Sequence, residues 1–510
     1  MSEREFDVVV VGGGLSGGLP AAAYLQRAGA SVALVELTDR CGSFFTSYER
    51  GAGVRFDVAP VNFSCVSPVP ADLELAAHGY RIDFPDVLWS TLDGSGRAVT
   101  YYADLRRTAE ELARYSRRDA RLFERLLSRL RERGRAILSA AMFTPSPDLD
   151  RALRLTAEAA ELAPGELERM TGPQLVEELF EADVVRVSAT ALPAINLFGD
   201  LLEPGQGALA WLWTFLLRSC RAPDGAAALP AAVERAFLAH GGTLLRRTAA
   251  RRLVLDGDGA CRGVAVDQGG RSELLVARQA VVSNLGADLT SELLGVDLRP
   301  GWRTAGRTVF VADVVLDRPL AWSSEALRRS QRVYLLWESW EACLDWLQAA
   351  RLEREEVFLG HLELTQFSVL YGSGKAGTPL RVRFGTGPFL DGDWDARRRR
   401  YEAPLRARIG RLDPDVTIRS LELQTPLDFW RSNPAARHGN PVGGDFAAGQ
   451  WLGERLPYRT GIPRLYLSNS VWPTSLSWMA PGYNAASVVA EDLGVRDRPW
   501  WINPPLPDLP

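Results

Sequence analysis

The spacing of hydrophobic and polar positions changes several times along this 510-residue chain, and the first change is the most informative. An apolar run over residues 8–11 stops at three glycines, an alanine-rich stretch follows over residues 21–28, and a second apolar run covers residues 31–35. Short apolar runs bounded by turn residues are typical of buried strands, and longer stretches of helix-forming residues are typical of helices. The chain is therefore predicted to begin with a strand, a tight turn, a helix and a second strand.

Helical spacing dominates the next part of the chain, and strand patterns return later. Charged and leucine positions predict a helix from residue 106 to about residue 138, with further helices over residues 151–162 and 173–180 between prolines. The later predicted segments are a helix over 224–240, a strand over 243–247, a hairpin between 253 and 266, a strand ending at residue 284, β-rich sections over 308–316 and 357–364, a strand over 465–468 and a helix over 485–493. A helical insertion and a β-rich insertion are thus predicted to interrupt one α/β domain.

The glycines after the first strand fit a nucleotide-binding pattern. Gly12, Gly14 and Gly17 match G-x-G-x-x-G, with Leu15 and Ser16 inside the loop. Each glycine is needed because a Cβ would block the turn, the approach of a pyrophosphate or the contact between helix and strand. Backbone N–H groups at the start of the following helix are expected to point at the phosphates, whose charge the helix dipole favours.

Glu36 ends the second strand, at about the 20-residue distance from the glycine loop that the pattern requires. A carboxylate in this position accepts hydrogen bonds from the ribose hydroxyls of an adenosine and repels a 2′-phosphate. The sequence therefore predicts FAD or NAD as the ligand and excludes NADP.

The residues that follow separate FAD from NAD. Residues 39–43 resemble the D-R-x-G-G segment of FAD enzymes of the glutathione-reductase-like superfamily, with Ser43 in place of the second glycine. Residues 56–60 resemble their F-D-x-G-P segment, with Ala59 in place of glycine. This resemblance implies FAD as the cofactor. It adds six expected contacts to those of the glycine loop and Glu36, which are Arg40, Gly42, Ser43, Pro60, Leu253 on the strand beside the adenine, and Asn284 at the end of a later strand.

Composition narrows the class of protein. With 46% hydrophobic residues, 24% charged residues and a net charge of −4, the chain is typical of a soluble globular protein and leaves no basic footprint for nucleic acid. The five cysteines lack C-x-x-C spacing and the four histidines are dispersed, so we expect free thiols and no metal site. The acidic start carries no signal-peptide pattern, and we expect a cytoplasmic protein. The dominance of arginine over lysine is typical of a GC-rich bacterial genome.

No apolar run of about 20 residues exists, so we expect no membrane-spanning segment. Residues 208–217, ALAWLWTFLL, come nearest and favour a core helix. Peripheral membrane contact or an apolar tunnel wall stays open as the alternative, because the chain ends in a Trp-rich segment from Pro499. Tryptophans between residues 322 and 394 favour a filled core, with a flat apolar substrate pocket as the alternative. The sequence leaves the oligomeric state open.

The blocks in their order, with the motifs PDGAAALPAAVERAFLAHGG, QTPLDFWRSNP and APGYNAASVVAEDLG, resemble the phytoene desaturase and carotenoid isomerase family over essentially the whole chain. The resemblance implies an α/β fold, with a Rossmann-like FAD-binding domain of the glutathione-reductase-like type interrupted by a mixed α+β substrate domain with a helical part. It assigns residues 1–65, 222–300 and 459–496 to the FAD-binding domain, 66–221 and 301–458 to the substrate-binding domain, and 497–510 to a C-terminal tail. It also implies a lipophilic, often polyene, substrate that gives a hydride to flavin N5 as a C–C single bond becomes a double bond.

The final block completes the expected flavin site. Asn469 and Ser470 stand where the family has a Gly-Asp or Gly-Ala pair. Gly482, Tyr483 and Asn484 open a helix whose N-terminus is expected to face the flavin. Tyr483 is the candidate catalytic acid or base, with packing or a flavin contact as its alternative role. The altered loop before this helix predicts a substrate other than an ordinary carotenoid precursor, in a pocket shaped by Trp472, Trp478 and Met479.

Three functions stay open on the sequence. The first is a dehydrogenase that forms C=C bonds in a polyene, isoprenoid or polyketide-type substrate, free or bound to a carrier protein. Such an enzyme would act as a natural-product tailoring step, ring-aromatising in one version, with oxygen or a quinone as acceptor. The second is a redox-neutral polyene isomerase that uses reduced FAD, and the third is a non-catalytic flavin-binding protein.

Overall fold

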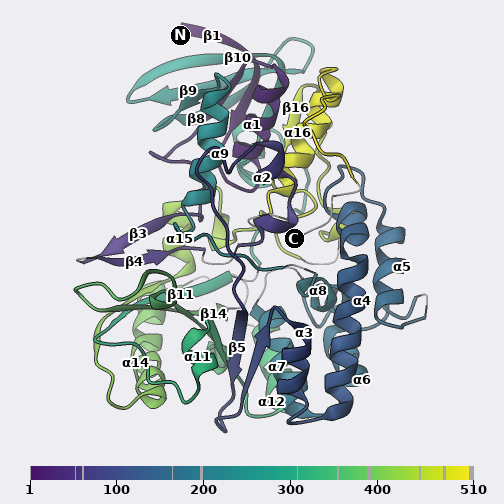
Figure 1. The fold of residues 1–510 in the computed structure, drawn as a ribbon. Coiled ribbons are helices and arrows are strands. Elements are labelled where there is room, and N and C mark those ends of the chain that lie inside the picture. Colours follow the sequence, from purple (N-terminus) through teal and green to yellow (C-terminus); the bar gives the residue numbers. More distant parts are fainter. Residues whose placement is uncertain are drawn as a thin grey trace.

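The computed structural model describes residues 2–51, 53–59, 62–163, 165–195, 199–216, 218–306, 308–352, 355–386, 392–446, 449–474 and 478–504. Two large sheets dominate these residues, with a block of helices beside the second sheet (Figure 1). The first sheet takes its strands from both ends of the chain and from its middle, whereas the second takes them from the two segments between. The predicted discontinuous α/β architecture is therefore found.

The first sheet has the order β7-β2-β1-β10-β9-β8, and β16 pairs with the end of β10. Its parallel strands are β1 (Ser2–Val11), β2 (Val32–Val35), β7 (Thr243–Leu245), β10 (Arg271–Ser283) and β16 (Leu465–Leu467), and its antiparallel strands are β8 (Ala249–Leu255) and β9 (Cys261–Gln268). The apolar run of residues 8–11 is buried because the strands around β1 are covered on both faces. Helices α1 (Gly18–Ala28), α9 (Ala228–Ala239) and α16 (Ala480–Asp492) pack together beside it, and α10 (Ala287–Leu294) contacts β8.

The second sheet has the order β15-β11-β14-β13-β12-β5-β6. Its strands are β5 (Val87–Leu92), β6 (Ala98–Tyr102), β11 (Thr308–Leu316), β12 (Arg332–Leu335), β13 (Leu362–Gln366), β14 (Thr378–Thr386) and β15 (Ile418–Gln424). On one face Phe310 and Phe384 stack at 5.1 Å and contact Trp394 and Tyr401 of α14 (Trp394–Leu412). The opposite face lies toward the short hairpin of β3 (Ser47–Arg50) and β4 (Val54–Asp57), where Arg50 reaches Asp313.

Helices flank this second sheet. The block drawn at the lower right of Figure 1 contains α3 (Leu105–Leu112), α4 (Arg117–Ala141), α5 (Leu149–Ala159), α6 (Gly172–Leu179), α7 (Asp183–Ile195) and α8 (Gln206–Thr214). The remaining helices are α2 (Val69–Asp72), α11 (Glu325–Arg329), α12 (Trp340–Arg351), α13 (Ser368–Tyr371) and α15 (Pro426–Ser432), with 3₁₀ turns η1 (Ser64–Val66), η2 (Glu355–Gly360), η3 (Arg437–Gly439) and η4 (Leu452–Glu454).

Two element predictions are wrong in detail. The single helix expected from residue 106 is two helices, because Ser116 leaves the helical conformation and its hydroxyl caps α4 by accepting from the Asp119 amide. The strand expected over residues 357–364 begins only at Leu362, because the preceding residues form η2 and pack against α12. Both differences arise from local caps and tertiary contacts, which apolar spacing does not report.

The tryptophan-rich and apolar stretches are core. Every residue of α8 is buried, as predicted for a core helix, and no helix among the described residues is long and apolar enough to cross a membrane. All five tryptophans between residues 322 and 394 are at most 6% exposed. The five cysteines are free and buried, as predicted.

The described part of the C-terminal tail packs against α1 and the end of α2. The ring of Trp501 lies 4.8 Å from that of Tyr24 on α1, and Trp501 is 2% exposed. The Ile502 amide donates to Asp72 Oδ1, and the Tyr24 hydroxyl donates to Asp72 Oδ2. Burial raises the pKa of Asp72 to about 7, although the Tyr24 hydroxyl and the Ile502 amide oppose that rise.

This buried carboxyl predicts a pH dependence of stability. Because its pKa is higher in the folded protein than in the unfolded chain, the folded state holds the extra proton between about pH 4 and about pH 7. Its contribution to stability is therefore greatest at acid pH and is lost as pH rises toward 7. In urea titrations at pH 5 and pH 8, Asp72→Asn is expected to weaken this decline relative to the wild-type protein, whereas the exposed control Asp258→Asn keeps it. An unchanged decline in Asp72→Asn would contradict the assignment.

Candidate functional site

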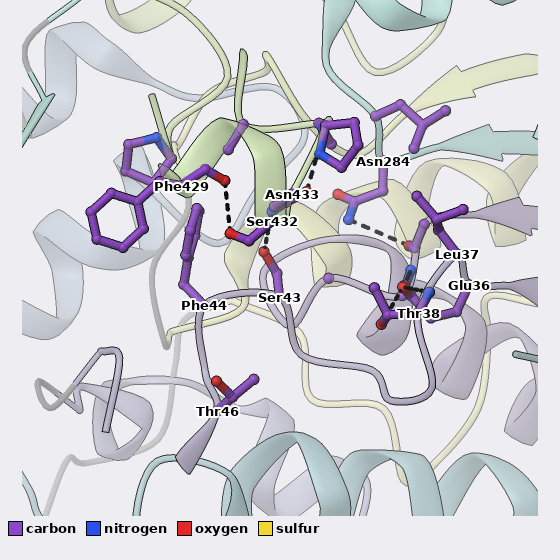
Figure 2. Close-up of a pocket in the computed structure, with 18 of the residues that line it drawn as sticks. Glu36, Leu37, Thr38, Ser43, Phe44, Thr46, Asn284, Phe429, Ser432 and Asn433 are labelled. Atoms are coloured by element: carbon purple, nitrogen blue, oxygen red, sulfur yellow. Dashed lines mark hydrogen bonds between the residues drawn. The ribbon is translucent and has the colours of Figure 1, made fainter. Parts of the chain in front are cut away.

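A cavity of about 810 Å³ lies along the carboxyl ends of the first sheet's parallel strands. Figure 2 shows Glu36 and Thr38 at one end, Phe44 and Phe429 at the other, and Ser43 and Asn433 between them. Ligands of open α/β sheets bind in this position, outside the carboxyl ends of the strands. The cavity is therefore the candidate cofactor site.

The glycine loop forms one wall of this cavity with its bare backbone. Gly12 has a φ of +91°, a conformation that side chains rarely adopt. A Cβ on Gly13 would stand 2.7 Å from Cys41 Sγ, and one on Gly14 would stand 2.6 Å from Asn284 Nδ2. At the start of α1 the Leu19 amide donates to the Gly14 carbonyl and Pro20 has no N–H, so among the first three residues of the helix the Gly18 amide is the donor left for a phosphate oxygen. This cradle fits a pyrophosphate.

Glu36 holds the loop and faces the cavity. Its Oε2 accepts a hydrogen bond from the Gly13 amide at 2.8 Å, and its Oε1 accepts from both the amide and the hydroxyl of Thr38 at 2.8 Å. Three donors keep the carboxylate in place, and of its about four lone-pair positions one is left to accept from a ribose hydroxyl. The observed carboxylate therefore fits the predicted adenosine end of FAD, and Thr248, Ala250 and Arg251 continue the wall there.

The D-R-x-G-G-like segment also borders the cavity. Arg40 and Ser43 line it, and the buried Gly42 donates its amide to the Gly13 carbonyl. Ser43 takes a φ of +54°, the left-handed conformation that explains the glycine usual at this place. Its hydroxyl accepts from Asn433 Nδ2 at 2.6 Å, so the serine links the cofactor crevice to the segment after α15.

Two of the expected cofactor contacts are asparagines that follow strand ends, and the structure brings them together. Asn284 and Asn469 line the cavity, and Asn469 Nδ2 donates to the Asn284 carbonyl at 3.2 Å. Ser470 lies behind them, buried, with its hydroxyl donating to the Gly443 carbonyl and accepting from the Ala287 amide. Ser470 therefore supports the wall and does not line it.

Two other predicted cofactor contacts, Leu253 and Leu15, do not line the cavity. Leu253 is 2% exposed in the core of the first sheet and does not line the cavity. Ala249, Ala250 and Arg251, at the beginning of the same strand β8, line it instead. Pro60 lies outside the described residues. Leu15 is buried under the loop, whereas Ser16 lines the cavity.

The start of α16 touches the glycine loop through its backbone. The Gly482 amide donates to the Ser16 carbonyl at 3.0 Å, and a Cβ on Gly482 would overlap the Gly17 carbonyl. Asn484 Nδ2 donates to the Met142 carbonyl and to the Tyr458 hydroxyl, whereas its buried Oδ1 has no partner among the described residues. Gly482 therefore lies against the loop, whereas Asn484 contacts Met142 and Tyr458, and neither residue lines the large cavity.

Tyr483 requires a correction. Its hydroxyl donates to the Ile502 carbonyl at 2.6 Å and accepts from Arg496, and its ring packs edge-on against Tyr24 at 5.6 Å. The helix begins at Ala480, two residues before the predicted opening, which turns Tyr483 toward α1 and the tail. Burial raises the pKa of Tyr483 to about 12. The structure gives this side chain a packing role in place of the predicted acid or base.

The predicted substrate residues lie around a second, much smaller cavity of about 10 Å³. Trp472 and Trp478 line it together with Trp213, Trp451 and Met142, and Trp472 Nε1 donates to the Ala141 carbonyl at 2.8 Å. Met479 is fully buried and lines neither of these two cavities. The two tryptophans are thus brought together with residues of the helical block, and Met479 is core.

The sequence analysis named none of the side chains that form one wall of the large cavity. Phe429 on α15 contacts Phe44 edge-on at 5.9 Å, and Arg398 and Gln424 lie on the same side. The motif QTPLDFWRSNP contains Phe429 and carried part of the family resemblance, but only the fold shows that it faces residues 43–48. No group of three metal-ligating side chains occurs among the described residues.

Comparison with a family model adds one match. The model of an NAD(P)-binding Rossmann-like domain matches residues 10–75. The chain is 26% identical to one of the subunits of limonene dehydrogenase from Castellaniella defragrans, with 99% of this chain and 98% of that protein covered. It is also 26% identical to rat pyridine nucleotide-disulfide oxidoreductase domain-containing protein 2, over 52% of this chain and 51% of that protein.

Solved structures agree on the fold. Cyclohexylamine oxidase from Brevibacterium oxydans matches with a TM-score of 0.55 and 16% identity, over 96% of this chain and all of that one. An oxidoreductase from Methanosarcina mazei matches with a TM-score of 0.54 and 14% identity, over 95% of this chain and 99% of that one. The mixed α/β fold with a Rossmann-like domain is thereby confirmed. FAD as the cofactor, an oxidoreductase activity and the narrower resemblance to phytoene desaturases stay predictions.

The contacts of Glu36 predict the effect of removing its charge. In Glu36→Gln one oxygen becomes an NH₂ group, which faces the Gly13 amide or the Thr38 donors and cannot accept from them. We expect the Kd for FAD to rise about tenfold or more, measured by fluorescence titration of the apoprotein. Asp39→Asn, at an exposed neighbour that also lines the cavity, is the matched control and should leave the Kd within about twofold. Equal affinities in the wild-type protein and Glu36→Gln would contradict the ribose assignment.

Proposed function

We propose that this protein is an FAD-dependent dehydrogenase that converts a C–C single bond of a lipophilic isoprenoid, polyene or polyketide-type substrate into a C=C bond. The observation that carries the proposal is the similarity to the limonene dehydrogenase protein, which extends over nearly the whole length of both chains. The apolar side chains of Trp213, Trp451, Trp472 and Trp478 lie together, and because the space among them is only about 10 Å³, an apolar substrate can lie there only after they move apart.

FAD, when bound, accepts a hydride from the substrate, while the second hydrogen leaves as a proton. The chain's own groups hold the cofactor: the glycine loop binds the pyrophosphate, and the Glu36 carboxylate accepts hydrogen bonds from the ribose. Oxidation of the substrate by two electrons requires that the reduced cofactor pass them on, and we propose oxygen or a quinone as the acceptor.

The side chains that line the aromatic cavity carry no titratable group among the described residues. These side chains therefore cannot take the proton. The proposal therefore places the base outside this cavity or in the substrate itself, where a neighbouring unsaturated group has made the C–H bond acidic.

The wider proposal concerns partners. A bacterial natural-product or terpene substrate, free or bound to a carrier protein, fits an enzyme of this class. The limonene dehydrogenase relative is, by its name, one subunit of a larger protein. A second protein chain is accordingly part of the proposal, alongside peripheral membrane contact as a source of a water-insoluble substrate.

Anaerobic mixing tests the reaction. The FAD-loaded protein is mixed without oxygen with a panel of a cyclic monoterpene, a linear isoprenoid alcohol and a C₄₀ polyene, and the flavin absorbance is followed. We expect one member of the panel to bleach the flavin stoichiometrically and to lose two hydrogen atoms in the reaction.

Other outcomes of that mixing have distinct meanings. Product formed only after the flavin has been reduced chemically, with no net change in oxidation state, would replace the dehydrogenase by the isomerase. No product in either state, from any member of the panel, would favour the non-catalytic flavin-binding protein.

A further inference from the structure

Two of the five cysteines lie against each other, although they are far apart in the sequence. Cys65 lies in η1, and Cys220 lies in the segment that follows α8. Their thiol groups are in hydrogen-bonding contact, which is the largest influence on the pKa of each. The pKa values of Cys41, Cys261 and Cys343 respond to no other cysteine. The part of the chain that the structure describes thus holds one close pair of thiols.

Backbone pairing brings the two cysteines together. Cys220 forms an antiparallel bridge with Asn62, in which the Cys220 amide donates to the Asn62 carbonyl at 2.9 Å. The Ser64 amide donates to Asn62 Oδ1 at 2.9 Å, so the chain turns directly after the bridge and enters η1. The Ser64 hydroxyl lies 3.7 Å from Cys220 Sγ. The position of the pair is therefore set by the main chain on both sides.

The two thiols differ in acidity. Cys65 carries a single proton, which it donates to the Arg218 carbonyl at 3.1 Å or to the Cys220 sulfur. Donation to Cys220 lowers the pKa of that thiol although burial opposes the change, whereas the same contact and burial both raise the pKa of Cys65. Cys220 is therefore the group that becomes a thiolate more readily, with a protonated thiol beside it. Such a pair is the arrangement in which oxidation leads to a disulfide.

The pair lies in the connection between the two large sheets. Figure 1 shows α2 beside the first sheet and β5 in the second sheet, so the chain leaves the first domain between these elements. It returns through residues 218–222, where Arg221 and Asp83 form an antiparallel bridge and an ion pair at 2.6 Å. Cys220 belongs to this returning segment, whereas Cys65 precedes α2. A bond between the two sulfurs would therefore cross-link the connection.

Both cysteines are also close in the chain to the aromatic cavity. Trp213, which lines this cavity, lies on α8, and Cys220 follows shortly after that helix ends at Thr214. Phe63 directly precedes η1, and its ring lies 6.4 Å from that of Trp478, which also lines the cavity. A disulfide would thus tie the end of α8 to the segment that contacts Trp478. The cavity admits a substrate only after its side chains move apart, and this bond would restrict that movement.

We propose that Cys65 and Cys220 form a reversible disulfide, which holds the aromatic cavity closed by tying α8 to the first domain. The effect on the substrate rests on the proposed dehydrogenase function, whereas the disulfide itself does not. The oxidant is hydrogen peroxide, which oxygen yields when it accepts the two electrons of a reduced flavin. It is small enough to reach sulfurs whose residues are 8% and 4% exposed.

The reaction takes two steps. The Cys220 thiolate attacks one oxygen of hydrogen peroxide, the O–O bond breaks, and the leaving hydroxide takes up the proton that Cys220 has lost, which gives a sulfenic acid and water. The Cys65 sulfur then attacks the Cys220 sulfur, the S–O bond breaks, and the hydroxyl leaves with the Cys65 proton as a second water. Two thiols thus lose two electrons and two protons, and one peroxide becomes two waters. An added dithiol reverses the change by exchange.

Mapping of the thiols tests the disulfide without a substrate. The FAD-loaded wild-type protein is treated with a few equivalents of hydrogen peroxide, catalase removes the excess, and the protein is denatured, alkylated, digested and analysed by mass. Five alkylated cysteines are expected before the treatment. After it, we expect Cys65 and Cys220 in one cross-linked pair of peptides and the other cysteines still alkylated. Dithiothreitol should restore all five.

Substitutions separate the roles of the two thiols. In Cys65→Ser the second thiol is missing, so Cys220 is expected to remain a sulfenic acid that dimedone traps. In Cys220→Ser the attacking thiolate is missing, so Cys65 should remain alkylated after peroxide. Cys343→Ser, at a buried cysteine outside the pair, is the matched control and keeps the disulfide. Flavin content and Tm, measured in each variant, identify any variant that has not folded.

Hydrogen exchange and flavin reduction test the closed cavity. We expect the amides of α8 to exchange more slowly in the oxidised wild-type protein than in the dithiothreitol-treated one, with those of α14 unchanged. A panel substrate that bleaches the flavin of the reduced protein should do so about tenfold or more slowly in the oxidised protein. In Cys220→Ser, peroxide treatment should leave the rate of bleaching unchanged.

The inference is overturned if peroxide leaves both thiols of the wild-type protein alkylated or joins a different pair. It is also overturned if the disulfide forms while exchange in α8, or the rate of bleaching by an accepted substrate, is the same in both forms. If the disulfide forms and slows exchange in α8 but no panel member bleaches the flavin of the reduced protein, the proposed function fails and the cross-link stands.

Discussion

The structure depends on one close approach of backbones, where no side chain is tolerated. A Cβ on Gly17 would overlap Asn284 Oδ1 and the Ser468 carbonyl, and one on Gly18 would overlap the Gly12 carbonyl. The same loop receives Gly482, whose own Cβ would overlap the Gly17 carbonyl. Segments from the beginning, middle and end of the chain therefore meet at a single glycine-lined point. This meeting creates the cofactor cradle and fixes how α16 is oriented.

The second sheet has one apolar face and one buried face that carries charged residues. Its outer face is apolar and packs on α14, whereas its inner face carries buried ion pairs between Asp313 and Arg381 and between Glu363 and Arg383. Buried pairs add little net stability but are costly to break, so they hold the sheet in one register. A site built on this face has fixed charges at fixed positions.

Much of the cofactor domain could be predicted because its determinants are local. The glycine loop, Glu36 and the strands around them are close in sequence, and the strand over residues 308–316 is found with the predicted bounds. Tyr483 could not be placed, since the start of α16 is set by the contact between Gly482 and the loop, hundreds of residues away. The alternation of polar and apolar residues in β12, β13 and β14 is visible in the sequence. Which of the two faces is covered depends on distant helices, so the buried pair of Asp313 and Arg381 appears only in the fold.

The central claim is that the glycine-lined cradle holds FAD in an enzyme, and the most direct measurement is the absorption spectrum of the purified protein together with mass analysis of the small molecule released on denaturation. The account predicts the two visible flavin bands and FAD as the released species, either as purified or after incubation of the protein with FAD. A folded protein that stays colourless after that incubation would contradict it, because the cradle would then exist without its ligand.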